Sequence, residues 1–199
     1  MNTALFRGVS FLSKCFTASG YFWLYTLKGL IVYGVLPAAC MLTAVLADLK
    51  QEGDADVALA SKGYYRKYQG VQSSSLVLSL IFVCLFSGLY WFSYHEGGNS
   101  LFFLIIVLYL LGLTLVITVY LTHFIVFGEM QLKQALTFSF VYCIKKWQYS
   151  LLLLASISSL YLISRDNLIV CIFILPFLLA LSSRWILEKA RLPLQAPFS

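Results

Sequence analysis

SLVLSLIFVCLFSGLYWFSYHEGGNSLFFLIIVLYLLGLTLVITVYLTHFIVF, residues 75–127, runs for 53 positions without a Lys or Arg. Its only acidic residue, Glu96, lies in a short polar break at 95–100. The apolar stretches on either side, 75–94 and 101–127, each supply the roughly 20 residues that an α-helix needs to cross a hydrocarbon core of about 30 Å. This stretch therefore predicts a transmembrane helical hairpin whose turn is 95–100.

The composition of the whole chain agrees with a membrane location. Apolar residues make up 61% of the sequence, charged residues make up 11%, and the mean hydropathy is +0.87. We therefore expect an all-α, polytopic transmembrane helix bundle that forms one integral membrane domain over 1–199, with the lipid bilayer as its solvent. The net charge of +6 does not indicate a nucleic-acid partner, because the basic residues lie beside the apolar stretches.

Five spans are predicted from the apolar stretches, at 21–36, 75–94, 101–127, 147–163 and 168–187. The first would end where Pro37 removes a backbone donor. Two segments, 38–70 and 129–146, mix charged and aromatic residues with apolar ones and are expected to lie at the membrane interface as short helices. The alternative is that 20–47 is re-entrant, which would leave four full spans.

The distribution of Lys and Arg orients the chain, because short loops rich in these residues stay in the cytoplasm. Both interfacial segments carry several of them, and the C-terminal tail carries Arg184, Lys189 and Arg191. We therefore expect a cytoplasmic C-terminus and an external 95–100 turn. Five spans would place the N-terminus outside, whereas the re-entrant alternative would keep it in the cytoplasm.

One face of the third predicted span is polar. Thr114, Thr118 and Thr122 repeat every four residues, and at about 100° per residue Glu129 returns to the same face. Such a stripe could pack against a neighbouring helix or line a solute path, and packing is the commoner use of threonine in membrane helices. His123 on the same span could titrate or bind a ligand, but its position near the end of the span favours an interfacial histidine.

Lys28 lies near the middle of the first predicted span, where a cation costs about 2.5 to 3.5 kcal/mol. That cost makes Lys28 a functional candidate, unless the segment is re-entrant or interfacial. Two local ion pairs are also predicted, between Glu129 and Lys133 and between Arg184 and Glu188, because each pair has four-residue helical spacing.

No motif for catalysis, metal binding or cofactor binding is present in the sequence. The five cysteines stand singly, without a metal-ligand spacing, and are expected to behave as small apolar residues. Small residues recur at four-residue spacing, as at Ser75 and Ser79, which favours close helix packing. We therefore expect a non-enzymatic protein with neither a metal nor a cofactor.

Three segments resemble the YesL family of bacterial integral membrane proteins, which is defined by domain of unknown function 624. They are WLYTLKGLIVYGVLPA at 23–38, YYRKY at 64–68 and FGEMQLKQAL at 127–136. Gly29, Gly34 and the Pro37-Ala38 pair carry the first similarity, whereas Lys28 departs from the apolar residue expected there.

The resemblance implies a multi-pass protein of the bacterial cell membrane, encoded beside sugar ABC transporters. It implies a non-enzymatic accessory or scaffold in carbohydrate uptake or utilisation, with ABC transporter permease subunits, a membrane sensor or further copies of the chain as partners. The alternative function is a small transporter or channel for a sugar or an ion, with Lys28 and the threonine stripe along its path.

Overall fold

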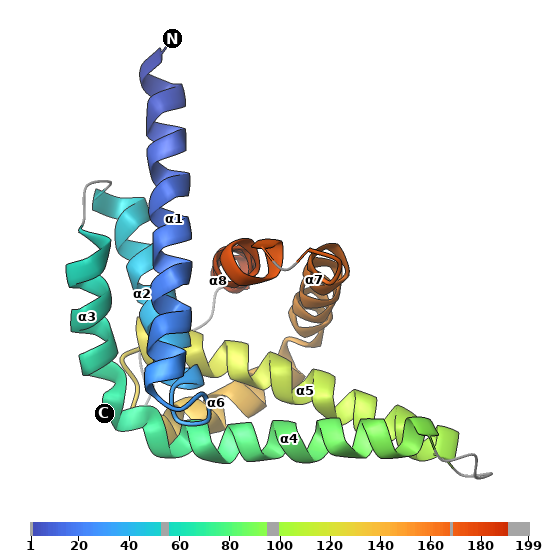
Figure 1. Cartoon of the computed structure of the whole chain (residues 1–199). Helices are drawn as coiled ribbons and strands as arrows, with labels where there is room; N and C mark the ends of the chain where they lie inside the picture. Colours follow the sequence, from blue (N-terminus) through green and yellow to red (C-terminus); the bar gives the residue numbers. More distant parts are fainter. Residues whose placement is uncertain (1, 53–55, 95–99, 168, 191–199) are drawn as a thin grey trace.

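The computed structural model describes residues 2–52, 56–94, 100–167 and 169–190, and nearly all of them are helical, without a strand among them (Figure 1). This confirms the all-helical class. In chain order the elements are α1 (Asn2–Lys28), α2 (Val35–Glu52), α3 (Val57–Lys67), the 3₁₀ turn η1 (Tyr68–Val71), α4 (Gln72–Tyr94), α5 (Ser100–Phe127), α6 (Leu132–Lys145), α7 (Trp147–Ser164), the π-helical turn η2 (Val170–Ile174) and α8 (Leu175–Lys189).

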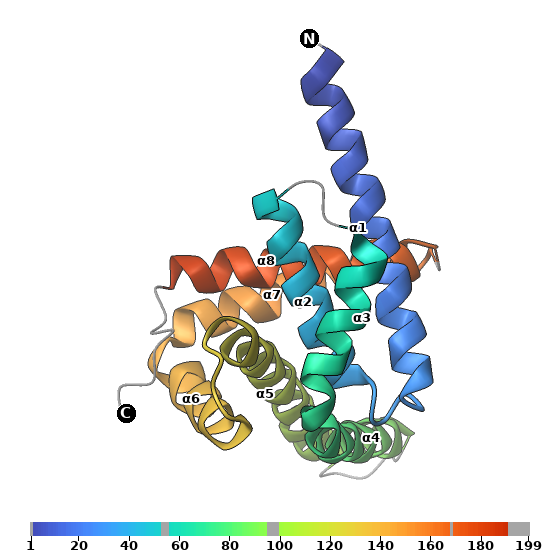
Figure 2. The same cartoon turned by 90° about the vertical axis from the view of Figure 1, so that its left-hand side faces the viewer.

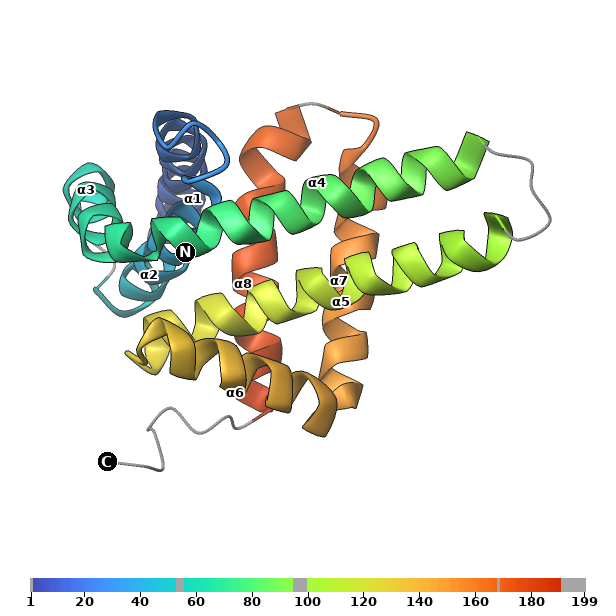
Figure 3. The ribbon, with the colours of Figure 1, turned by 90° about the horizontal axis from the view of Figure 1, so that it is seen from below.

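Helices α4 and α5 form the hairpin predicted from the uncharged stretch, and their bounds match it closely. The two helices pack side by side along their length (Figure 3). Near the end of α4 and the start of α5, the rings of Phe92 and Phe103 stack with their centroids 5.3 Å apart. A Cβ placed on Gly88 would lie 3.6 Å from the Val107 side chain, an ordinary van der Waals contact, so the packing there does not require glycine. Of the expected turn, 95–99 lies outside the described residues.

A second hairpin follows from α7 and the continuous η2–α8 segment, as predicted from 147–163 and 168–187, although Leu168 lies outside the described residues. Four helical segments are therefore long and apolar enough to cross a membrane: Val57–Tyr94, Ser100–Phe127, Trp147–Ser164 and Val170–Lys189. The α7–α8 hairpin crosses the α4–α5 hairpin and does not run alongside it (Figure 3). In this arrangement the two hairpins do not share one axis.

The predicted first span at 21–36 is wrong, because the chain reverses within it. Helix α1 ends at Lys28 and α2 begins at Val35, antiparallel to it (Figure 1). Hydropathy continues across the reversal, so it concealed the break. Pro37 does not end a helix either; it lies in the first turn of α2, where its missing N–H costs no intrahelical hydrogen bond.

Two glycines make this reversal sterically feasible. A Cβ on Gly29 would lie 2.4 Å from the Gly34 Cα atom, and one on Gly34 would lie 2.5 Å from the Thr26 carbonyl oxygen. Between them, Leu30 and Ile31 adopt left-handed φ angles of 54° and 60°, which L-residues seldom adopt. The turn forms backbone hydrogen bonds of its own, such as the one from the Ile31 N–H to the Thr26 carbonyl at 2.8 Å, and contacts from outside the segment add to them.

Those contacts come from the first turns of α4. The hydroxyls of Ser75 and Ser79 both donate to the Val32 carbonyl oxygen, at 2.8 and 3.0 Å. The Leu36 backbone N–H donates in turn to the Ser75 Oγ atom at 3.2 Å. An unpaired backbone group costs several kcal/mol where no water reaches it, so these three bonds allow a broken helix to lie against an apolar one.

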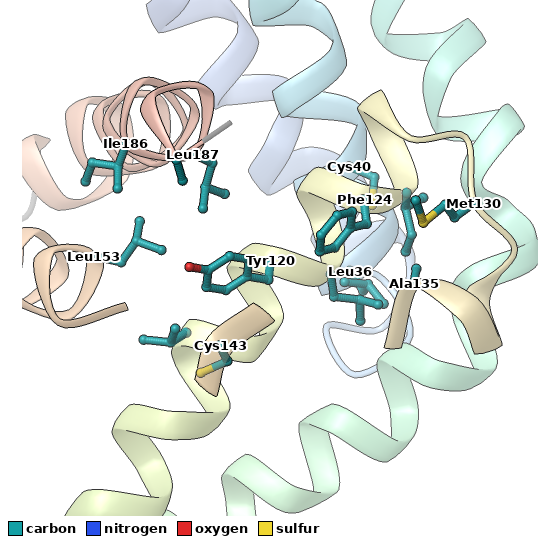
Figure 4. Close-up of a cluster of buried hydrophobic side chains, with 14 of the residues drawn as sticks. Leu36, Cys40, Tyr120, Phe124, Met130, Ala135, Cys143, Leu153, Ile186 and Leu187 are labelled. Carbon is teal, nitrogen blue, oxygen red and sulfur yellow. The ribbon is translucent and has the colours of Figure 1, made fainter. Parts of the chain in front are cut away.

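Helix α2 lies inside the bundle, between α1, α3, α5 and α8 (Figure 2). Its Cys40 and Leu46 are 0% and 1% exposed, so the part of 38–70 that forms α2 does not have the predicted interfacial position. Leu36 and Cys40 lie beside Phe124 of α5 in the main cluster of buried side chains, and Tyr120 of the same helix points toward Leu153 (Figure 4). Helix α3 covers α2 from outside, and its Tyr64 hydroxyl donates to the Asp48 carboxylate at 2.6 Å.

A second hydrogen bond joins α1 to η2, the turn that leads into α8. Pro176 has no N–H to donate to the carbonyl of Ile172, four residues earlier. The indole N–H of Trp23 donates to that carbonyl instead, at 2.7 Å. The π-helical turn at 170–174 lies next to this proline, as such turns commonly accompany disturbed hydrogen bonding in a helix.

Replacing both serines with alanine, in S75A/S79A, should destabilise the protein by about 1 to 2 kcal/mol, because the Val32 carbonyl loses both donors. Unfolding in detergent, followed by circular dichroism, measures the change. Ser93→Ala is the matched control, since the Ser93 hydroxyl bonds only the Leu89 carbonyl of its own helix. Equal stability of the double variant and the control would show that these bonds do not hold the turn.

Candidate functional site

The described residues bring charged side chains together where α2 and α8 meet. Arg184 lies on α8 with only 12% of its side chain exposed, and its Nε donates to the Glu188 carboxylate one turn later at 2.5 Å. This confirms the predicted pair. Lys50 of α2 adds a second cation, with its Nζ atom 4.0 Å from the other Glu188 oxygen. The carboxylate therefore links two helices that are far apart in the sequence.

An aromatic side chain of α5 completes this group. The Arg184 guanidinium lies over the Phe127 ring, 5.2 Å from its centroid, a geometry that stabilises a cation with little water around it. The ring of His123 lies 4.8 Å from the same centroid. His123 is 5% exposed, so its ring is buried within the protein.

We refer to His123, Phe127, Arg184, Glu188 and Lys50 as the α5–α8 polar cluster. The cluster holds two cations and one carboxylate. The Arg184 Nη1 atom is buried and has no hydrogen-bond partner among the described residues. The arrangement can hold α2, α5 and α8 in fixed register through one carboxylate and one guanidinium. Sequence spacing predicted the Arg184–Glu188 pair, but nothing in the sequence pointed to Lys50 or Phe127 as its neighbours.

The hydroxyls of the threonine stripe donate hydrogen bonds to backbone carbonyls of their own helix. Thr114 donates to the Leu110 carbonyl at 2.8 Å, and Thr118 donates to the Thr114 carbonyl at 2.7 Å. Thr122 does the same toward Val119, at 2.8 Å. All three hydroxyl protons satisfy backbone acceptors one turn earlier, which favours the packing interpretation over a solute path.

Glu129 does not extend this stripe. Helix α5 ends at Phe127, and Glu129 adopts a left-handed φ of 47° before α6 begins at Leu132. The predicted helical pair with Lys133 is therefore wrong. Glu129 pairs instead with Lys67 of α3, 3.2 Å away, and both side chains are more than half exposed, so the pair contributes little to stability.

Lys28 is not buried in the middle of a span. It is exposed in the last turn of α1, directly before the reversal. A cation there faces the negative end of the helix dipole, which is favourable by about 0.3 to 1 kcal/mol. Lys28 is therefore a cation at a helix end and not a residue in the middle of a continuous helix.

The cysteines lie apart from these groups and are all free. Burial raises the pKa of the Cys40 thiol to about 12 and that of Cys15 to about 11. Thiols with such high pKa values stay protonated and unreactive at neutral pH, in agreement with a packing role. Within the described part of the chain, no group of His, Cys, Asp and Glu side chains has the geometry to hold a metal ion.

An open apolar groove of about 520 Å³ runs between α1 and η2, away from the polar cluster. Its walls come from Phe16, Thr17, Gly20, Tyr21, Leu24 and Phe173. None of the candidate residues predicted from the sequence lines it. The candidates are therefore separate in the structure. The threonines bond their own helix, Glu129 forms an exposed ion pair, Lys28 lies at an exposed helix end, and His123 is buried within the polar cluster.

Comparison of the chain with protein-family models, with curated proteins and with solved structures found no match. The resemblance to the YesL family, and everything it implies about function, therefore stays a prediction.

Glu188→Gln should destabilise the protein by about 1 to 2 kcal/mol, because the largely buried Arg184 would lose its only carboxylate partner at hydrogen-bond distance in the structure. This figure is below that for a fully buried pair, since 45% of the Glu188 side chain is exposed. Asp166→Asn is the control, because it removes the exposed Arg165–Asp166 pair and should cost no more than about 0.5 kcal/mol. Detergent unfolding curves that coincide for the two variants would contradict a structural role for the cluster.

Proposed function

We propose that this chain is a multi-pass membrane accessory protein, or scaffold, that acts through helix contacts with another membrane protein. By its resemblance to the YesL family, we further propose that the partner is an ABC transporter permease or a membrane sensor in carbohydrate uptake, in a bacterial cytoplasmic membrane.

The observation that carries this proposal is how the polar groups of the apolar helices are used. The threonine hydroxyls bond their own helix, and Ser75 and Ser79 bond the Val32 carbonyl. Large apolar side chains, in contrast, cover the outside. With these hydroxyls bonded within the protein, the outer surface of the bundle is left for recognition.

The α4–α5 hairpin is the best candidate for the recognition element. Its outer half extends beyond α7 and α8 (Figure 3). Aromatic side chains that are exposed by 60 to 68% gather on that half, namely Tyr90, Trp91, Phe102 and Tyr109. Aromatic residues are enriched among those that dominate protein–protein binding energy, so a partner helix would find its strongest contacts there.

The competing function is a small transporter or channel for a sugar or an ion. The threonine stripe remains its only structural support, because each threonine oxygen can still accept a second hydrogen bond. We favour the accessory role, since the stripe's protons are already donated to the helix.

For topology, we propose an even number of spans with both termini in the cytoplasm, and the crossing of the two hairpins leaves open which of them spans along the membrane normal (Figure 3). Helices α1 and α2 then form a pair that enters and leaves on one side, which is the re-entrant alternative. Reporters fused to either end test this: an enzyme that is active only in the cytoplasm should work at both termini. A reporter at the N-terminus that is active only outside would restore the five-span topology.

Recovery of the protein from membranes in a mild detergent tests the accessory role. We expect ABC permease subunits or a sensor to be enriched with the tagged wild type, and Tyr109→Ala to lower that enrichment several-fold by removing an exposed aromatic contact. Tyr161→Ala on α7, with a similarly exposed ring, is the matched control. Recovery of the chain alone, together with sugar or ion uptake by liposomes that contain it, would favour the transporter instead.

A further inference from the structure

One end of the α7–α8 hairpin is built as a corner. Helix α6 stops at Lys145 and α7 starts at Trp147, with the chain turning at Lys146 (φ −111°, ψ 43°). As a result α6 runs across the start of α7 and not along it (Figure 3). The Tyr149 hydroxyl donates to the Lys189 carbonyl at 3.5 Å, so the first turn of α7 and the last turn of α8 lie at this same end.

This end combines cations with exposed aromatic rings. It carries Lys145, Lys146 and Lys189, together with Trp147 and Trp185, whose side chains are each 60% exposed. The Lys189 Nζ atom lies 5.0 Å from the centroid of the Trp185 ring. Indole rings beside lysines are typical of the headgroup level of a membrane, where the ring is half in lipid and the cation faces anionic oxygens.

Little negative charge offsets these lysines. The sequence has no acidic residue from Met130 to Arg165. The one carboxylate on the last turns of α8, Glu188, is already bonded to Arg184 and lies 4.0 Å from Lys50. The end of the hairpin is therefore a locally cationic surface, complementary to anionic lipid.

Helix α6 provides the apolar part of the same surface. Its Ala135, Ser139 and Cys143 are buried on the side toward the bundle, whereas Leu136, Phe140 and Ile144 are 49 to 62% exposed on another side. With 14 residues it is too short to cross a bilayer, which takes roughly 20. A short helix that is apolar on its outer side and ends in lysines fits the boundary between headgroups and acyl chains.

We propose that this end of the α7–α8 hairpin, with α6, binds the anionic phospholipids of one membrane leaflet: Lys145, Lys146 and Lys189 contact the headgroup phosphates, and the exposed side of α6 contacts the upper acyl chains. The proposal requires only that α7 and α8 cross a membrane with this end at the level of the headgroups. It is independent of the partner and of the role in carbohydrate uptake.

Tryptophan quenching tests this contact at a single position. The full-length variant W23F/W91F/W185F keeps Trp147 as its sole tryptophan. It is reconstituted into vesicles of phosphatidylcholine that contain an increasing fraction of phosphatidylglycerol. In one series the phosphatidylcholine is brominated, and in the other the phosphatidylglycerol is brominated. We expect brominated phosphatidylglycerol to compete for the position beside Trp147 at least about fivefold better than brominated phosphatidylcholine, as one lysine near an anionic surface would give.

Trp91 is the matched control, because it is also 60% exposed but lies at the far end of α4, in a stretch without Lys or Arg. A variant with Trp91 as its sole tryptophan should show a lipid preference close to one. Lys145→Gln with Lys146→Gln should bring the preference at Trp147 down toward that value and leave Trp91 unchanged. Removal of Trp23 also removes its bond to Ile172, so the difference between wild type and Trp147→Phe supplies the same measurement in an otherwise intact protein.

The outcomes separate clearly. A preference at Trp147 that falls in the lysine variant and in high salt supports the proposal. Equal preferences at Trp147 and Trp91, or a preference that survives loss of both lysines, overturns it. Failure of both brominated lipids to quench Trp147 also overturns it, because the surface would then be covered by protein.

Discussion

The hydrogen bonds from Ser75 and Ser79 to the Val32 carbonyl are the constraint on which the packing of the first half of the chain depends. A helix can lie in apolar surroundings because it pairs its own backbone, and a broken helix loses that advantage. Here the break between α1 and α2 is completed by side chains of another helix. This lets α2 fold back into the bundle, where Cys40 and Leu36 become core residues against α5.

A side chain also completes the backbone hydrogen bonding where α1 meets η2. Pro176 leaves a carbonyl of η2 without its usual donor, and the Trp23 indole supplies one. In both places a backbone irregularity at one position is matched by a polar side chain more than 40 residues away. The polar residues of the apolar helices are therefore best understood as parts of the scaffold, and the functional proposals rest on the outer surface.

The sequence predicted those parts of the fold that depend on local composition. The α4–α5 hairpin and the spans of α7 and α8 follow from about 20 consecutive apolar residues, a signal that needs no knowledge of contacts. The reversal at 29–34 could not be found this way, because its residues are as apolar as their neighbours and its shape depends on the approach of Gly29 to Gly34. The predicted pair of Glu129 with Lys133 is wrong for a related reason. The pairing assumes a continuous helix, and the left-handed backbone of Glu129 interrupts it.

In the candidate site, likewise, only the contact between residues one helical turn apart could be predicted from the sequence. Four-residue spacing paired Arg184 with Glu188, but the approach of Lys50 and Phe127 depends on how α2 and α5 pack against α8. Lys28 illustrates the converse. Its predicted position in the middle of a span came from assuming one continuous helix over 21–36, whereas α1 ends at Lys28.

The distance along the chain between Val32 and its donors has a consequence for biosynthesis. Ser75 follows Val32 by 43 residues, so the reversal leaves the ribosome well before α4 exists to complete it. Until then its carbonyl has only water as a partner, and burial of α1 and α2 in lipid would be unfavourable. The first two helices should therefore wait at the aqueous boundary during synthesis and take their final place only after the α4–α5 hairpin has been inserted.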